Sequence, residues 1–99
     1  MDIHEAKTLI DQGNVTIVDI RDPGSYAEAR IAEAIHLRDE NVDAFLKETN
    51  KERPVLCYCY HGNSSQQAAA FLQEHGFKTV YSMDGGFEAW RNIYSIITV

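Results

Sequence analysis

The chain has 99 residues, which is enough for one domain with a single hydrophobic core, and we expect one domain over residues 1–99. Its composition, 44% hydrophobic and 24% charged, is typical of a soluble globular protein. The formal net charge of −6 argues against nucleic acid or an anionic membrane as a partner, because both attract basic surfaces. No apolar run approaches the roughly 20 residues that a membrane span needs.

The first half of the chain alternates between helical and β-rich segments. Asp2 and Glu5 have the spacing of a capping box and Gly13 is a typical helix stop, so a helix is expected between Asp2 and Gly13. Either Asp39 or Asn41 can start a later helix. The other expected elements are a strand over 15–20 that ends in turn residues 21–25, a helical turn or two over 26–30, and a short strand over 34–37.

The second half contains the clearest strand–helix unit. Residues 54–59 are predicted to form the central strand, and 64–75 a helix that Gly76 ends. On this helix the apolar spacing predicts a buried face of Ala68, Phe71, Leu72 and His75. The chain continues with a strand over 79–82, a turn at Asp84-Gly85-Gly86, a helical segment over 87–90 and a tail, 94–99, of strand composition.

Strands that alternate with helices at this spacing predict an α/β fold. We expect a mainly parallel central sheet of four to five strands with helices on both faces. In such folds ligands bind beyond the carboxyl ends of the strands. Cys59 is predicted to stand at such an end, so topology and chemistry indicate the same place for a site.

The segment Cys59-Tyr60-His61-Gly62-Asn63-Ser64-Ser65 joins a cysteine to a tight polar turn and a helix start. The N–H groups of such a turn and the positive end of the helix dipole both stabilise a thiolate. Ser64 and Gln67 have capping-box spacing and are expected to anchor the helix start. The alternative is that Cys59 is an inert core thiol, as many free cysteines are, but the polar residues after it favour the first interpretation.

The second cysteine, Cys57, is expected to pack in the core. In a strand Cys57 and Cys59 would have Cα atoms about 6.5 Å apart and parallel side chains, so no disulfide is expected between them. No metal or other cofactor is expected, because these cysteines and His61 have no second ligand cluster elsewhere in the chain. Free thiols, and an acidic start without a secretory apolar stretch, indicate a cytoplasmic location.

Three separated segments resemble motifs of the rhodanese-like family of sulfurtransferases. Val18-Asp19-Ile20-Arg21-Asp22-Pro23 resembles the family's N-terminal signature, Val-Asp-(Val/Ile)-Arg-(Glu/Asp)-Pro. Cys59 and its loop match the family's active-site loop in position and length. Residues 81–90, Tyr-Ser-Met-Asp-Gly-Gly-Phe-Glu-Ala-Trp, resemble its C-terminal Gly-Gly-x-x-x-Trp signature. Three motifs in the right order are far more specific than any one of them.

The resemblance implies a thiosulfate sulfurtransferase that works without a cofactor. The Cys59 thiolate would take the outer sulfur of thiosulfate as a persulfide. It would then pass this sulfur to cyanide in an assay, or to a thiol or a thioredoxin-like dithiol protein in the cell. The implied site consists of Cys59 as the catalytic residue and, for substrate binding, Tyr60, His61, Gly62, Asn63, Ser64 and Ser65. A persulfide carrier or a non-enzymatic binding module on the same fold is the alternative.

The chain departs from the family pattern in three respects. The loop has no Arg or Lys, which many thiosulfate sulfurtransferases carry there, so weak affinity for thiosulfate is expected. The family's Gly-His-Ile-x-Gly-Ala stretch appears here as residues 29–34, and only Ile31 and Ala34 are kept. The short strand that usually precedes the first helix is not evident, so either it is absent or the tail 94–99 fills an edge of the sheet.

Other residues of the three motifs have structural interpretations. Asp19, Arg21 and Asp22 are expected to hold a loop beneath the site through arginine–carboxylate pairs rather than to touch substrate. Gly85-Gly86 is expected to allow a sharp turn that brings Trp90 onto the core. A cysteine phosphatase needs Cys-x5-Arg, and Ser65 occupies the arginine position, so that activity is not expected.

Overall fold

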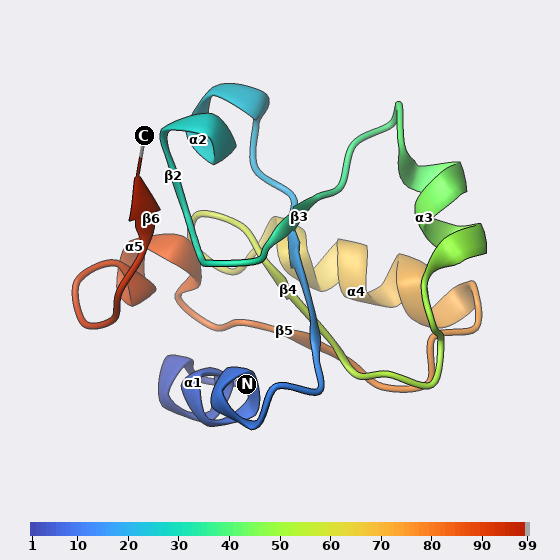
Figure 1. The fold of residues 1–99 in the computed structure, drawn as a ribbon, viewed down its shortest axis with the longest axis horizontal. Helices are drawn as coiled ribbons and strands as arrows, with labels where there is room; N and C mark the ends of the chain where they lie inside the picture. The colour runs from blue at the N-terminus through green and yellow to red at the C-terminus, as the bar shows by residue number, and fades with distance from the viewer. Residues whose placement is uncertain (99) are drawn as a thin grey trace.

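The computed structural model describes residues 1–98 (Figure 1). The helices are α1 (Ile3–Gln12), α2 (Pro23–Glu28), α3 (Val42–Glu48), α4 (Ser64–Glu74) and α5 (Gly86–Trp90). The strands are β1 (Thr16–Asp19), β2 (Ala29–Arg30), β3 (Ile35–His36), β4 (Val55–Tyr58), β5 (Val80–Ser82) and β6 (Ile97–Thr98). The predicted helix between Asp2 and Gly13 is confirmed, because Asp2 and Glu5 form the capping box and Gly13 ends α1 with a φ of 83°.

The central sheet has four parallel strands in the order β3-β1-β4-β5. Val18 of β1 pairs with Cys57 of β4, and Cys57 pairs in turn with Ser82 of β5. The carboxyl ends of β4 and β5 therefore lie side by side, and the residues that follow them meet at one edge. The predicted α/β fold with a mainly parallel sheet is confirmed.

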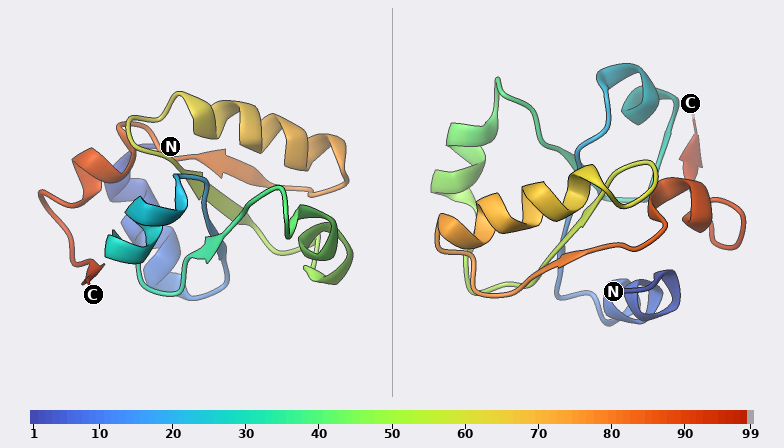
Figure 2. Two further views of the ribbon diagram at one scale, coloured as in Figure 1. Left: turned by 90° about the horizontal axis from the view of Figure 1, so that it is seen from above. Right: turned by 180° about the vertical axis from the view of Figure 1, so that it is seen from behind.

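Helices cover both faces of this sheet (Figures 1 and 2). Successive strand residues point to opposite faces, so neighbours in β1 and β4 enter different cores. Ile17 and Leu56 pack with side chains of α1 and α5 in one hydrophobic cluster. Val18 and Cys57 pack with side chains of α3 and α4 in the other.

Residues 94–98 do not join the central sheet, so the alternative in which the tail fills its edge is wrong, and the first element that the structure describes is α1. Ile97–Thr98 pairs antiparallel with Ala29–Arg30 in a separate two-stranded sheet, and residue 99 lies outside the described residues. The indole N–H of Trp90 donates to the carbonyl of Ser95 at 3.1 Å, which holds the tail near the end of α5. The position beside β5 is taken by Met1, whose carbonyl accepts from the N–H of Asp84 at 2.8 Å.

The predicted buried face of α4 is correct at Leu72 but wrong at Phe71 and His75. Ser65, Ala69 and Leu72 are buried, whereas Phe71 is 37% exposed and His75 is exposed as well. The rotation of the helix is set at its first turn, where Ser65 points inward to the side chains of Cys59 and Ser82. With Ser65 facing the sheet, the residues four and seven positions later face it too.

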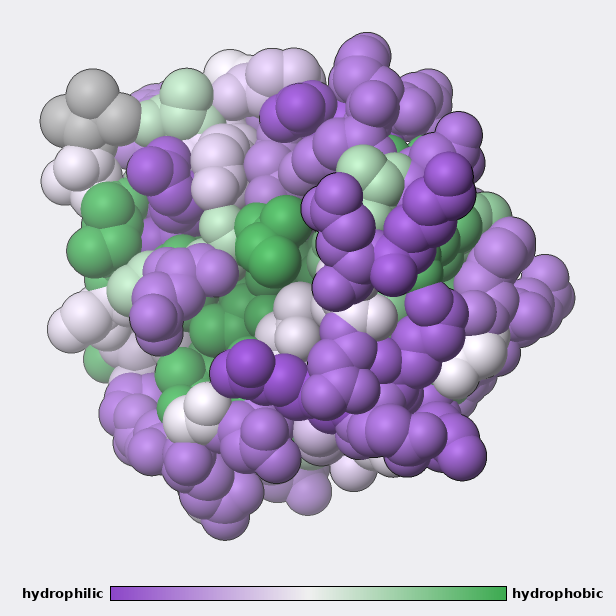
Figure 3. Space-filling model, turned by 45° about the vertical axis from the view of Figure 1, so that its right-hand side comes forward, coloured by the Kyte–Doolittle hydropathy of each residue, from purple (hydrophilic) through white to green (hydrophobic). Residues whose placement is uncertain are grey.

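The surface agrees with the acidic, strongly polar composition. Figure 3 shows a face covered mostly by hydrophilic residues, with smaller hydrophobic areas between them. None of the helices within residues 1–98 combines the length and the apolar character that crossing a membrane requires.

The orientation of α4 gives a matched pair of substitutions. Leu72→Ala should lower the free energy of unfolding by about 2–5 kcal/mol, because it leaves a cavity between α4 and the sheet. Phe71→Ala removes a larger side chain from the partly exposed face and should cost about 1 kcal/mol or less. Urea unfolding followed by circular dichroism measures both. A larger loss for Phe71→Ala would mean that the helix is rotated the other way.

Candidate active site

Cys59 directly follows β4, and residues 59–65, here called the Cys59 loop, lead into the first turn of α4. The side chain of Cys59 is buried, with 5% of the residue exposed. Three polar groups of the same loop surround its sulfur: two N–H groups donate to it, and the Ser65 hydroxyl accepts from the thiol and can donate once the sulfur is a thiolate. The N–H of Gly62 lies 3.1 Å from Sγ, and the N–H and hydroxyl of Ser65 each lie 3.4 Å from it.

These donors decide the ionisation of the thiol. Burial raises the pKa of Cys59, but hydrogen bonds from the Ser65 hydroxyl and from the N–H groups of Ser65, Gly62 and His61 outweigh burial and leave the pKa below its ordinary value. The N-terminus of the 11-residue α4 adds the positive end of a helix dipole. A sulfur with a lowered pKa is more often a thiolate, which is the nucleophilic form.

The expected capping box at Ser64 and Gln67 is not present. Ser64 is the first residue of α4, and Asn63, which precedes it, makes no side-chain capping hydrogen bond. The free N–H groups of the first helical turn are therefore not all satisfied by a capping side chain, and that of Ser65 points to the sulfur of Cys59. The N-terminus of α4 therefore has a backbone donor available to the sulfur of Cys59.

Helix α5 holds the back of the Cys59 loop. The N–H of Phe87 donates to the carbonyl of Cys59 at 2.7 Å, and the N–H of Glu88 donates to the carbonyl of Tyr60 at 3.1 Å. At Gly86, which has a φ of 61°, an added Cβ would lie only 2.4 Å from the Tyr60 carbonyl oxygen. The turn at Gly85-Gly86 was expected, but its second role, close contact with the Cys59 loop, was not visible in the sequence.

A buried ion pair lies beneath α5. The guanidinium of Arg21 contacts the Asp19 carboxylate, with Nη2 2.6 Å from Oδ2 and Nε 3.0 Å from Oδ1. The same guanidinium donates to the carbonyl of Ala29 and stacks 4.0 Å from the ring centre of Phe87. The expected arginine–carboxylate pair is thus present between Asp19 and Arg21, and both side chains are buried.

Asp22 works differently from the expected arginine pair. It caps α2, accepts from the N–H of Ser25 at 3.0 Å, and accepts a hydrogen bond from the hydroxyl of Tyr60. Hydrogen bonds from Tyr60 and Ser25 lower the pKa of this exposed carboxyl to about 2. Tyr60 therefore ties the Cys59 loop to the start of α2, and its hydroxyl is directed at that contact.

The remaining predicted binding residues lie around the mouth of the loop. The residues His61, Asn63 and Ser64 are exposed, whereas Gly62 and Ser65 are buried beneath them against the sulfur. The loop thus presents polar side chains outside and donors inside. Within residues 1–98 no group of His, Cys, Asp and Glu side chains is arranged to hold a metal ion.

The chain is similar in sequence to known proteins over most of its length. Residues 2–93 match the family described as Rhodanese-like domain. A "Thiosulfate sulfurtransferase GlpE" of Tolumonas auensis is 46% identical over 92 residues, which cover 93% of this chain and 87% of that protein. One of the same name from Pseudomonas entomophila is 50% identical over 90 residues, 91% of this chain and 82% of that protein.

The chain belongs to the rhodanese-like family.

Two solved structures share its architecture. The rhodanese-like domain of the Alr3790 protein from Anabaena superposes with a TM-score of 0.87 at 28% identity, over 100% of this chain and 78% of that one. The BH2092 protein from Bacillus halodurans superposes with a TM-score of 0.81 at 30% identity, over 93% of this chain and 70% of that one. The rhodanese-like fold of this chain therefore places the cysteine loop at the carboxyl edge of a parallel sheet.

The other cysteine of this rhodanese-like chain has the opposite environment. Cys57 is completely buried in the core under α3 and α4. Burial, together with the nearby charge of Cys59, raises the pKa of the Cys57 thiol to about 12. Both thiols are free. Cys57 is therefore a core side chain, as the sequence indicated, and it remains a neutral thiol near neutral pH.

A residue that sequence reasoning missed is Ser82, the last residue of β5. Its hydroxyl lies 2.7 Å from the hydroxyl of Ser65. The available signal was weak: Ser82 ends a predicted strand, and strand ends of a parallel sheet meet at one edge. Without the strand order, nothing in the sequence placed it beside Cys59 rather than elsewhere along that edge.

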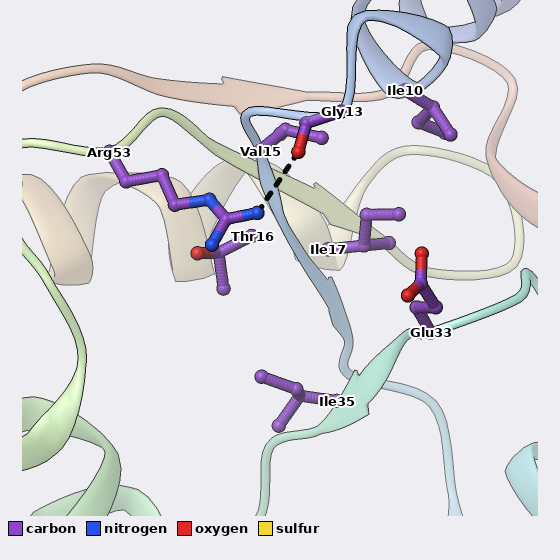
Figure 4. A pocket seen from close by; sticks show the side chains of 8 residues that line it. All are labelled: Ile10, Gly13, Val15, Thr16, Ile17, Glu33, Ile35 and Arg53. Carbon is purple, nitrogen blue, oxygen red and sulfur yellow. Dashed lines mark hydrogen bonds between the residues drawn. The ribbon is translucent and has the colours of Figure 1, made fainter.

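A hollow of about 250 Å³ lies near the amino end of β1, at the other end of the sheet from Cys59 (Figure 4). Arg53 and Glu33 lie on opposite sides of it, and Arg53 donates to the carbonyl of Gly13 at 3.1 Å. Ile17 and Ile35 lie on its wall, but more of its lining is polar than apolar, and among residues 1–98 neither a thiol nor a histidine lines it. The thiol of Cys59 lies outside this hollow, at the carboxyl edge of the sheet.

The contact between Gly86 and the loop can be tested by comparison with Gly13. Gly86→Ala combines a left-handed backbone with a clash against the loop, so alkylation of Cys59 by iodoacetamide should become several-fold slower at neutral pH. Gly13→Ala has the same type of backbone strain, about 1–2 kcal/mol, but an added Cβ there meets nothing within 4 Å. In Gly13→Ala the rate of Cys59 alkylation should stay at the wild-type value.

Rates are followed by mass spectrometry, and unfolding in urea shows how much stability each variant loses. Equal alkylation rates for Gly86→Ala and Gly13→Ala would show that α5 does not hold the loop in its donor-rich shape.

Proposed function

We propose that this chain is a thiosulfate sulfurtransferase that transfers a sulfane sulfur through a persulfide on Cys59. The observation that carries the proposal is the convergence of the Gly62 N–H, the Ser65 N–H and the Ser65 hydroxyl on a sulfur whose pKa is lowered. The relatives named thiosulfate sulfurtransferase, at 46% and 50% identity over most of the chain, support the choice of donor.

In the first half-reaction the Cys59 thiolate attacks the outer sulfur of thiosulfate. A new S–S bond forms, the bond between the two sulfurs of thiosulfate breaks, and sulfite leaves with that electron pair. The terminal sulfur of the resulting persulfide is anionic. The N–H groups that favour the thiolate are suited to solvate this charge as well, because they are fixed dipoles in a site shielded from water.

In the second half-reaction an acceptor attacks the terminal sulfur and the Cys59 thiolate leaves. Cyanide would give thiocyanate, and a thiol would give a persulfide. With a dithiol protein such as thioredoxin, the second thiol would complete the reduction and release hydrogen sulfide. We place Tyr60, His61, Gly62, Asn63, Ser64 and Ser65 around the donor, as the loop that receives thiosulfate.

The loop offers thiosulfate no positive side chain. Residues 59–72 contain neither Arg nor Lys, and the nearby Arg21 is buried and paired with Asp19. Donor binding would depend on N–H and hydroxyl groups alone, so we expect weak affinity for the dianion. The lack of a positive side chain in the loop also supports a second role, that of a persulfide carrier that receives its sulfur from another protein rather than from thiosulfate.

We further propose that residues 1–99 form one domain that acts in the cytoplasm. Two free cysteines are typical of a reducing compartment, and a thiolate nucleophile must stay reduced to work.

The persulfide can be detected directly. Treatment with thiosulfate should add about 32 Da, one sulfur atom, to the intact protein, and cyanide or dithiothreitol should remove it. Cys57→Ser should still take up the sulfur, whereas Cys59→Ser should not. Mass spectrometry of the intact protein and of its peptides measures this. Uptake of sulfur by Cys59→Ser would show that Cys59 is not the cysteine that carries the persulfide.

Turnover separates the enzyme from the carrier. A sulfurtransferase should produce thiocyanate from thiosulfate and cyanide in many cycles per molecule, with no activity in Cys59→Ser. If wild-type protein takes up sulfur from a persulfidated protein but does not turn over thiosulfate at any accessible concentration, the carrier role replaces the enzymatic one.

A further inference from the structure

Two serine hydroxyls form a chain that ends at the sulfur of Cys59. Ser82 Oγ at the end of β5 lies 2.7 Å from Ser65 Oγ in the first turn of α4, and Ser65 Oγ lies 3.4 Å from Cys59 Sγ. Ser65 is fully buried, and Ser82 is partly buried. The three side chains come from three elements that the parallel sheet brings to one edge.

A hydroxyl has one proton to donate, so the direction of this chain depends on the charge of the sulfur. While Cys59 is a thiol, its S–H can donate to Ser65, and Ser65 can donate onward to Ser82. When Cys59 loses its proton to water, the sulfur needs donors instead. Ser65 must then turn its O–H toward the sulfur, and Ser82 can donate to the oxygen of Ser65. No O–H bond breaks in this change, since the two hydroxyls only rotate.

We infer that Ser82 is a positioning residue for the sulfur chemistry: its hydroxyl holds Ser65 as a donor to Cys59 whenever that sulfur is negatively charged. Ser65 is fully buried, so its hydroxyl depends on protein groups for its hydrogen bonds, and loss of one partner is costly. A donor that itself accepts a hydrogen bond is polarised and donates more strongly, an effect that is larger where the surroundings exclude water. Ser82 therefore acts on the sulfur through Ser65, without touching it.

Other charged and titratable groups surround the site, and substitutions at Ser82 and Ser65 do not change them. They are His61 in the loop, Cys57 in β4, the Asp19–Arg21 pair, Glu88 in α5, and Asp84 with the amino group of Met1 beside β5. Within residues 1–98 none of them hydrogen-bonds to the hydroxyl of Ser65 or of Ser82; the Met1 amino group donates to the Ser82 backbone carbonyl at 3.1 Å, a contact that Ser82→Ala keeps. A change in Cys59 ionisation on removal of the Ser82 hydroxyl can therefore be attributed to the serine chain.

The test measures the rate of Cys59 alkylation by iodoacetamide between pH 5 and pH 10. Ser82→Ala should move the midpoint of this profile upward by about half to one pH unit, and the rate below the midpoint should fall about three- to tenfold, as expected for one weakened hydrogen bond. Ser82→Thr keeps the hydroxyl and should stay within about twofold of wild type. Ser95→Ala, which removes the hydroxyl of an exposed serine in the tail, is the matched control and should leave the profile unchanged.

A second comparison separates action through Ser65 from a general structural effect. In a Ser65→Ala background, Ser82→Ala should cause no further shift of the midpoint, because the intermediate hydroxyl is already gone. Urea unfolding of each variant shows that the proteins compared are folded. The inference is overturned if Ser82→Ala leaves the midpoint in place, or if it shifts the midpoint equally with and without Ser65.

The inference rests on the proposed function only in taking Cys59 as the reactive sulfur. Alkylation uses no thiosulfate, so the two can fail separately. If thiosulfate transfers no sulfur but the midpoints shift as described, the choice of donor is wrong and the role of Ser82 stands.

Discussion

The sulfur of Cys59 is buried and yet its pKa is lowered, and the rest of the site is organised around that conflict. Burial alone raises the pKa of a thiol, as it does for Cys57 two residues earlier in the chain. The two cysteines differ in the donors near them: only Cys59 has the N–H groups of Gly62 and Ser65 and the Ser65 hydroxyl at its sulfur. Keeping three donors aimed at one atom requires a fixed backbone. Helix α5 supplies part of that rigidity through the carbonyl of Cys59, and the Asp19–Arg21 pair supports α5 from below.

The negative charge at this site is stabilised by dipoles rather than by ions. The guanidinium of Arg21, which stacks on Phe87, already has its charge balanced by Asp19. Fixed dipoles act over short distances and are screened little by salt, whereas ion pairs at a surface weaken as ionic strength rises. A chain with a net charge of −6 also does not attract anions from a distance. The loop is therefore suited to hold a charge that forms within it more than to collect anionic donors from dilute solution.

The sequence was sufficient for the fold class and for the position of the Cys59 loop, because both depend on patterns that physical chemistry restricts strongly. Strands alternating with helices specify a parallel sheet, and a polar turn after a β-rich run specifies its carboxyl edge. The rotation of α4 was not predictable in the same way, since its buried face begins with Ser65, a polar residue that no apolar pattern includes. The pairing of Ile97–Thr98 with Ala29–Arg30 involves two-residue strands, which are too short for any periodicity. Ser82 became relevant only when the strand order placed β5 beside β4.

The burial of Cys57 has a consequence for the lifetime of whatever is attached to Cys59. Enzymes that carry a second thiol near the first can discharge an oxidised sulfur internally by closing a disulfide. Here the second thiol is packed under α3 and α4, paired along β4 with its neighbours on both sides, and held in its protonated form. To reach Cys59 it would have to leave the core and break the central strand. Any adduct on Cys59 must therefore wait for a molecule from outside, and its residence time is set by the concentration and access of that molecule.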